Sequence, residues 1–213
     1  MEDLVGALVT GKRWEPARGF ELTDEIRVTI AAHAALLLLG DGFHLDAYRK
    51  VTSIVVHAST IVVRGEQPAH VPGLMSDEDT WLDGQAEDRG PIHLAWDAVL
   101  HDVRHARGGR NVVVHECAHV LDMLDGVVDG SPPLDRDDRP HWDDVWRNEL
   151  DRQRSRPDEA LFDEYAAESP AELFAVASEA FFTIGDVVRA ERHELYDLLV
   201  GYYRQDPAAR FAR

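Results

Sequence analysis

The 213-residue sequence contains a single cysteine, Cys117. One cysteine excludes an internal disulfide framework, and its scarcity is typical of proteins in a reducing compartment. Long hydrophobic runs are missing as well, because the densest apolar stretch, residues 30–39, is interrupted by His33 and is too short to span a bilayer. No basic region precedes an apolar run at the N-terminus. We therefore expect a cytoplasmic protein without a membrane span or a secretory signal.

Basic residues are scarce relative to acidic ones. The sequence has 22 Lys and Arg against 40 Asp and Glu, which gives a net charge of −18 when histidine is neutral. A surface this negative repels the phosphate backbones of DNA and RNA. The composition therefore argues against direct nucleic-acid binding.

The apolar content is high enough for a packed core. Apolar residues make up 45% of the sequence and charged residues 29%, which excludes a wholly disordered chain. Helix and strand patterns are mixed in the first half, and helical patterns dominate the second half. We expect an α+β fold in a single domain, residues 1–213, with a cleft between two lobes. The mixed lobe, approximately residues 1–110, holds a small sheet, and the lobe of residues 111–213 is helical.

Capping residues and β-branched runs predict where several elements lie. Thr23 and Asn111 each precede an apolar pattern with helical spacing and are suited to be N-caps. The runs 53–57 and 60–63 are rich in β-branched residues and predict strands. Residues 91–96 predict a further short strand.

The helix expected after Asn111 contains the sequence His115-Glu116-Cys117-Ala118-His119. Residues four apart lie on nearly the same face of a helix. Both imidazoles can therefore bind one metal ion from the same side and leave its other positions open. Glu116 is close enough to take a proton from a water activated by that metal. The alternative is a pair of histidines on a helix that only packs, but the apolar residues on both sides favour a buried active-site helix.

A catalytic zinc ion needs a third protein ligand, and two acids follow the motif closely. Asp125 would require a sharp turn after His119, usually made by glycine, and Asp122 occupies the turning position instead. We therefore reject Asp125. Asp122 is too near on the same helix to complete a tetrahedron, and we expect it to accept a ring N–H from a ligating histidine. The alternative for Asp122 is a solvated acid on the helix surface.

A second predicted helix offers acids further along the chain. Ser169-Pro170-Ala171-Glu172 combines an N-cap, a proline in the first turn and an acid at the third helical position. Glu172 is therefore equally suited to complete a capping box with Ser169. Spacing alone does not choose the ligand among Glu164, Glu168, Glu172 and Glu179.

Longer segments around these residues resemble the Mlc titration factor A family of zinc-dependent peptidases. The resemblance lies in residues 111–122, which include the histidine motif, and in residues 165–176, which include Tyr165 and Glu172. Residues 31–39, 90–96 and 202–207 also resemble the family. The resemblance covers most of the chain, and the combination of two helices is more specific than the five-residue motif. It implies a zincin-like metallopeptidase fold.

The resemblance also implies roles for individual residues. One Zn²⁺ ion would be bound by His115, His119 and Glu172, and Glu116 would be the general base. Tyr165 would stabilise the oxyanion, as a tyrosine does in the similar catalytic domain of anthrax lethal factor. The alternative for Tyr165 is a buried core residue with a satisfied hydroxyl.

We further expect Glu179, like Asp122, to lie behind the ligands and support them. The family name implies a transcriptional repressor as a binding partner.

From these observations we predict a zinc metallopeptidase that hydrolyses peptide or protein substrates. An extended substrate is expected to pair with the sheet edge formed by residues 91–96. The alternative from another class is a zinc-containing protein that sequesters a transcriptional regulator with little or no hydrolysis. Glu116 argues against this alternative, because a structural zinc site has no use for a base. Hydrolysis of non-peptide amides is a third interpretation.

Overall fold

The computed structural model describes residues 1–40, 44–63, 67–68, 75–76, 80–82, 84–86 and 90–210. In this part of the chain the helices are α1 (Glu2–Gly11), α2 (Asp24–Leu36), α3 (Trp96–Arg104), α4 (Val112–Asp122), α5 (Arg139–Ser155), α6 (Pro170–Glu191) and α7 (His193–Tyr203). The strands are β1 (Arg13–Pro16), β2 (Ser53–His57), β3 (Ile61–Val63), β4 (Gln67–Pro68), β5 (Met75–Ser76), β6 (Thr80–Leu82), β7 (Gly84–Ala86) and β8 (Ile92–Ala95). The expected α+β class is confirmed. No helix among the described ranges is both long and apolar enough to cross a membrane.

Three of the predicted helix starts carry the expected caps. The Thr23 hydroxyl accepts the N–H of Ile26 at the start of α2, and the Asn111 side chain accepts the N–H of Val114 at the start of α4. Ser169 caps α6, and Pro170 occupies the first helical position, where its missing N–H costs no hydrogen bond. The helices that carry the histidine motif and Glu172 therefore begin where local sequence signals place them.

Four strands form a mixed sheet in the order β1-β2-β8-β7. Strands β1, β2 and β8 run parallel, and β7 pairs antiparallel with β8. The prediction that residues 91–96 form a sheet edge is wrong, because β8 lies between β2 and β7. Strand β7 is the edge on this side, and its sequence, Gly84-Gln85-Ala86, has no β-branched residue that would have predicted it.

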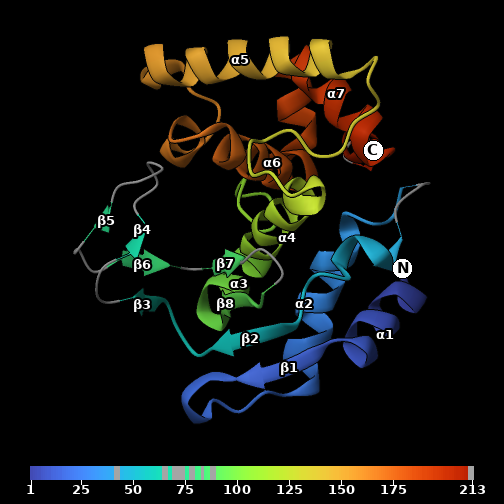
Figure 1. The fold of residues 1–213 in the computed structure, drawn as a ribbon, viewed down its shortest axis with the longest axis vertical. Helices are drawn as coiled ribbons and strands as arrows, with labels where there is room; N and C mark the ends of the chain where they lie inside the picture. Colours follow the sequence, from blue (N-terminus) through green and yellow to red (C-terminus); the bar gives the residue numbers. More distant parts are fainter. Residues whose placement is uncertain are drawn as a thin grey trace.

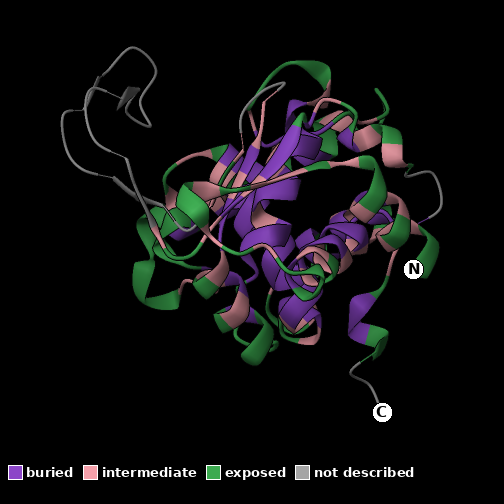
Figure 2. Ribbon diagram, turned by 90° about the horizontal axis from the view of Figure 1, so that it is seen from below, coloured by how far each residue is buried: buried purple, intermediate pink, exposed green. Residues whose placement is uncertain are grey.

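Helix α4 lies at the centre of the fold, between the sheet with α2 on one side and α6 on the other (Figure 1). Most of its residues are buried. Figure 2 shows that the buried residues gather in the interior of the fold and the exposed ones at its periphery. Helices α5 and α7 pack against the far side of α6. An aromatic core fills the space between these helices; it includes Trp142, Trp146, Phe174, Phe181 and Tyr203.

The backbone of Gly130 joins the end of α4 to α5 and α6. Its N–H donates to Oδ2 of Asp122 at 2.9 Å, and its carbonyl accepts the indole N–H groups of Trp142 at 3.1 Å and Trp146 at 2.7 Å. Its φ of 73° lies in the left-handed region, and a Cβ there would collide with the carbonyl of Pro170. Only glycine fits at this position, which holds the start of α6 against the end of α4.

Candidate metal centre and cleft

Two helices bring three ligand-type side chains together. His115 and His119 project from α4, and Glu172 projects from the first turn of α6. The Nε2 atoms of the two histidines lie 3.1 Å apart. Oε2 of Glu172 lies 3.2 Å from Nε2 of His115, and Oε1 lies 3.4 Å from Nε2 of His119. The structure therefore places these three residues in one cluster, with a ligand atom of each within 4.8 Å of the others.

The donor atoms of this cluster fit a tetrahedral cation site. Donors about 2.0–2.1 Å from a zinc ion at tetrahedral angles are about 3.3 Å from one another. Oε2 of Glu172 is buried and makes no hydrogen bond to any described residue. Buried acceptors and ring nitrogens that converge without donors are costly unless a cation compensates them. Two imidazoles and a carboxylate are also ligands that zinc prefers.

The carboxylate of Glu179, two turns after Glu172 on α6, fixes the ring of His115. Its Oε1 lies 2.8 Å from Nδ1 of His115, and its Oε2 accepts the backbone N–H of Asn111 at 2.5 Å. A ring that donates its Nδ1–H to a carboxylate keeps its Nε2 lone pair available for a metal. The Nε2 of His115 faces the cluster in this tautomer.

Glu172 does not complete a capping box. Its backbone N–H donates to the Ser169 hydroxyl at 3.1 Å, but its carboxylate faces the two imidazoles. Burial raises the pKa of Glu172, and its interactions with His115 and His119 outweigh burial and hold the pKa well below its ordinary value. Glu164 and Glu168 are exposed and do not belong to the cluster.

The cluster is buried enough to shift the pKa values of its neighbours. Burial lowers the pKa of His115, but its interactions with the carboxylates of Glu172 and Glu179 outweigh burial, and the pKa lies well above its ordinary value. Glu116 is only 4% exposed, and burial raises its pKa although His115 and His119 act in the opposite direction. A carboxyl group with a raised pKa is suited to accept and return a proton.

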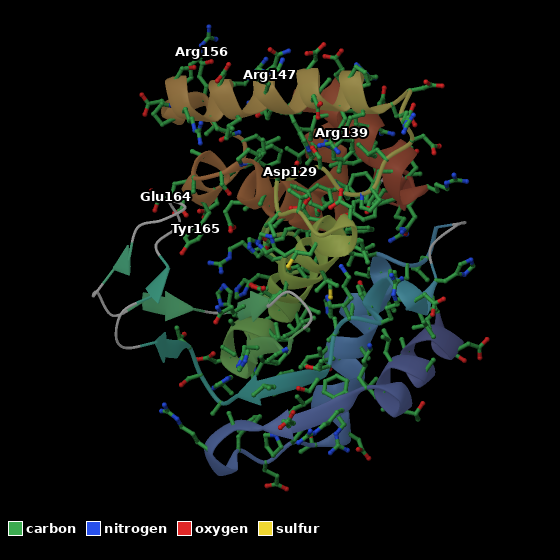
Figure 3. All side chains as sticks on the ribbon, viewed as in Figure 1. Asp129, Arg139, Arg147, Arg156, Glu164 and Tyr165 are labelled. Atoms are coloured by element: carbon green, nitrogen blue, oxygen red, sulfur yellow. The ribbon has the colours of Figure 1, made fainter. Side chains whose placement is uncertain are left out.

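A cleft of about 640 Å³ opens beside the cluster, and His115, Glu116 and Glu179 line it. Tyr165 lines the same cleft from a short 3-10 helix, Glu164–Ala167. Figure 3 shows Tyr165 and Glu164 next to each other below α5. Tyr165 is 39% exposed, so its ring is not the buried core residue that was the alternative interpretation.

Among the described residues, Asp122 does not make the expected hydrogen bond to a histidine ring. Oδ2 of Asp122 accepts the N–H of Gly130, and Oδ1 has no hydrogen-bond partner among the described residues. Burial raises the pKa of Asp122 to about 6. The side chain therefore connects the end of α4 to the following loop, because its hydrogen-bond donor, the N–H of Gly130, lies eight residues further along the chain. Asp125 is exposed and lies outside the cluster, in agreement with its rejection as a ligand.

Several cleft residues were not identified from the sequence. They are Gly84, Leu161, Phe162, Val176, Ala180 and Ile184. They come from β7, from the loop before the 3-10 helix and from the second to fifth turns of α6. Apolar and glycine residues such as these carry no local signal that distinguishes a cleft wall from the core. The packing of α6 against α4 brings them together.

Comparison with known proteins shows which family this chain is similar to. The profile of the family described as glucose-regulated metallo-peptidase M90 matches residues 1–204. The chain is 34% identical to the uncharacterized protein slr2042 of Synechocystis sp., over 97% of this chain and 76% of that protein. It is 32% identical to proteins named Mlc titration factor A from Yersinia pestis and Yersinia pseudotuberculosis, over 97% of this chain and 77% of theirs. The chain therefore belongs to the glucose-regulated metallo-peptidase M90 family.

Proposed function

We propose that this protein is a zinc-dependent peptidase that hydrolyses peptide bonds in peptide or protein substrates. One observation carries the proposal: His115, His119 and Glu172 converge beside a cleft in which Glu116 is buried next to them. A closed structural site would have no open cleft and no use for an adjacent base. Membership of a metallopeptidase family supports the same reaction class.

The proposed chemistry assigns a separate task to each side chain. Zinc held by His115, His119 and Glu172 would act as a Lewis acid and lower the pKa of water towards neutrality. Glu116 accepts the proton of the attacking water and returns it to the leaving amine nitrogen. The Tyr165 hydroxyl donates a hydrogen bond to the former carbonyl oxygen as negative charge develops on it.

We also propose how the chain is organised around this site. Residues 1–213 act as a single domain, with the cleft between a mixed lobe of about residues 1–110 and the helical lobe of residues 111–213. The lone cysteine, which is buried, fits a cytoplasmic protein. The high negative charge disfavours nucleic acid as a substrate or partner.

The test combines metal analysis of the purified protein with cleavage of a peptide library in the presence and absence of a chelator. We expect about one zinc ion per chain, and hydrolysis that the chelator abolishes and added zinc restores. Glu116→Gln should keep the metal and lower kcat by about 10²–10⁴-fold, because it removes only the base. Unchanged turnover in this variant would rule out Glu116 as the base.

The names of the Yersinia relatives favour a second candidate function. They are called Mlc titration factor A, a name that indicates titration of a protein called Mlc. We propose as the alternative that this chain binds a transcriptional regulator and has little or no hydrolytic activity. Two results together would favour this alternative over the peptidase. A regulator would copurify with both the wild type and Glu116→Gln, and the wild-type protein would cleave no peptide.

A further inference from the structure

Beyond Glu172, the side of α6 that faces the cleft carries apolar side chains. Val176, Ala180 and Ile184 follow Glu172 at intervals of four residues, so they lie about one turn apart on a ridge of α6 that is inclined to the helix axis. The backbone at Ile184 itself is non-helical, with φ −130° and ψ 37°. All three line the cleft. At 1.5 Å per residue, this apolar row extends about 18 Å from the candidate metal ligand. The proposed hydrolytic chemistry uses none of these three side chains.

Other apolar groups complete the same wall. Leu161 and Phe162 line the cleft from the loop before the 3-10 helix. Gly109 also lines it, with a φ of 82°, and a Cβ there would stand 3.4 Å from Cδ1 of Ile184. A glycine turn therefore lies against the end of the apolar row.

Apart from the residues around the metal cluster, the charged residues of the cleft are more exposed than the apolar row. Arg110, Asp163 and Glu164 line the cleft but are exposed, whereas Val176 and Ala180 are buried. A charged substrate side chain laid against the apolar row would lose water without gaining a partner. An apolar side chain there gains about 25 cal/mol for each Å² removed from water.

We propose that this wall is a subsite for one apolar side chain of the substrate, next to the scissile bond, and that Ala180 sets the size it accepts. The inference rests on the proposed peptidase function and specifies its substrate class. Ala180 has the smallest side chain of the row and lies between Val176 and Ile184. A larger side chain at position 180 would therefore project into the part of the cleft that the row lines.

The first test profiles the cleavage sites in a defined peptide library by mass spectrometry and compares kcat/KM for matched peptides. The wild-type protein should favour Leu or Phe over Asp, Glu or Lys at one position flanking the cleaved bond. Ala180→Leu should lower the kcat/KM ratio of the Phe peptide to the Ala peptide by about tenfold or more, and Ala180→Gly should raise it. Ala190→Leu is the matched control, because Ala190 is exposed on the same helix; its ratio should equal that of the wild type.

The ratio is measured within each preparation, so a partly unfolded variant does not distort it. Absence of an apolar preference, or an unchanged ratio in both Ala180 variants, would overturn the subsite. If the wild-type protein hydrolyses no peptide, the peptidase proposal fails instead. Calorimetric titration of the same peptides into Glu116→Gln then tests the subsite through binding, and equal affinities for the Phe and Asp peptides would exclude it.

The backbone of Gly84 in β7 lies directly against the side chain of Glu116. A Cβ built on Gly84 would stand 2.5 Å from Oε1, 2.8 Å from Cγ and 2.9 Å from Cδ of Glu116. Gly84 pairs with Leu94 of the neighbouring strand, which holds its backbone in place, and Glu116 is buried. A side chain at position 84 must therefore displace the carboxyl group of Glu116.

We infer that Gly84 is a positioning residue for Glu116. With no side chain at position 84, the carboxyl group occupies the space against β7 and lies beside the metal cluster. A misplacement of about 1 Å at such a group can cost about 10²-fold in rate. This inference also rests on the proposed function, but it is independent of the apolar subsite.

Gly84→Ala tests this role through kcat, KM, metal content and the crystal structure of the variant. We expect zinc content and KM to match the wild type, while kcat falls about 10²-fold and the Glu116 carboxyl group is displaced. Gly201→Ala is the matched control, because a Cβ there meets no atom within 4 Å. Unchanged kcat in an active protein, loss of zinc together with activity, or an undisplaced carboxyl group would each overturn the inference. Inactive wild-type protein would contradict the peptidase proposal alone, and the crystal structure would still test Gly84.

Discussion

Oε1 of Glu179 lies 2.8 Å from Nδ1 of His115, and the other oxygen of the same carboxylate accepts the backbone N–H of Asn111 at 2.5 Å. One carboxylate of α6 therefore holds both the N-cap of α4 and an imidazole one turn further along that helix. Because α6 also supplies Glu172, this helix completes the metal cluster and orients one of the rings that α4 contributes. Metal affinity should depend on Glu179 even though Glu179 is not in the cluster itself.

Replacing Glu179 should therefore weaken metal binding. Loss of a carboxylate that orients a ligating histidine typically costs about 10–100-fold in metal affinity. We expect Glu179→Ala to raise the Kd for zinc by that factor, and Glu179→Gln to have a smaller effect because its amide oxygen still accepts the ring N–H. Competition with a chromophoric chelator measures both values. Glu194→Gln, an exposed acid of α7, is the control; equal Kd values for Glu179→Ala and the wild type would contradict the orienting role.

Glu172→Ala should weaken zinc binding more than the Glu179 variants do, because it removes one of the three metal ligands. A ligand that binds only the folded state stabilises it by an amount that grows with the ratio of its concentration to Kd. Zinc should therefore raise the Tm of the metal-free wild type and have little effect on the Tm of Glu172→Ala. Thermal unfolding with and without zinc measures the difference. An equal rise in both proteins would show that zinc binds elsewhere.

Local sequence patterns predict one half of the candidate site. The positions of His115 and His119 depend only on the helical repeat, and Asn111 predicts the start of that helix. The choice of Glu172 over Glu164 and Glu168 depends on how α6 packs against α4, which no local pattern encodes. The family resemblance therefore supplied that choice.

The hydrogen bond of Asp122 and the formation of β7 could not be predicted from local patterns either. Asp122 lies one turn from His119, but Gly130, eight residues further on, provides its hydrogen bond. Strand β7 forms because it pairs with β8, although Gly84-Gln85-Ala86 has weak strand propensity. In both cases the contact depends on a partner in the following segment, which the pattern of the local segment does not identify.

Tyr165→Phe should separate catalysis from metal binding. The variant keeps the ring that lines the cleft and removes only the hydroxyl that would donate to the developing oxyanion. Removal of one such donor costs about 10²–10³-fold in kcat. We expect a decrease of that order, with zinc content and KM close to those of the wild type. If kcat is unchanged, Tyr165 forms part of the cleft wall without a role in the reaction.

Asp122 should make the stability of the metal-free protein depend on pH. Burial raises its pKa to about 6 in the folded state, above the ordinary value of 3.8. The folded state therefore binds this proton more tightly than the unfolded state does. The associated stabilisation is fully present below about pH 4 and is lost as the pH rises through 6, with a size of about 3 kcal/mol.

Asp122→Asn carries no charge at any of these pH values, and its amide oxygen still accepts the N–H of Gly130. We expect the metal-free variant to be more stable than the wild type at pH 7.5 and to lose most of this advantage at pH 4.5. Urea unfolding in the presence of a chelator, at both pH values, measures the free energies of unfolding. Asp137→Asn, at an exposed acid, should show the same difference between the two pH values as the wild type. If Asp122→Asn also shows the wild-type difference, the burial of the Asp122 carboxylate does not affect stability in this pH range.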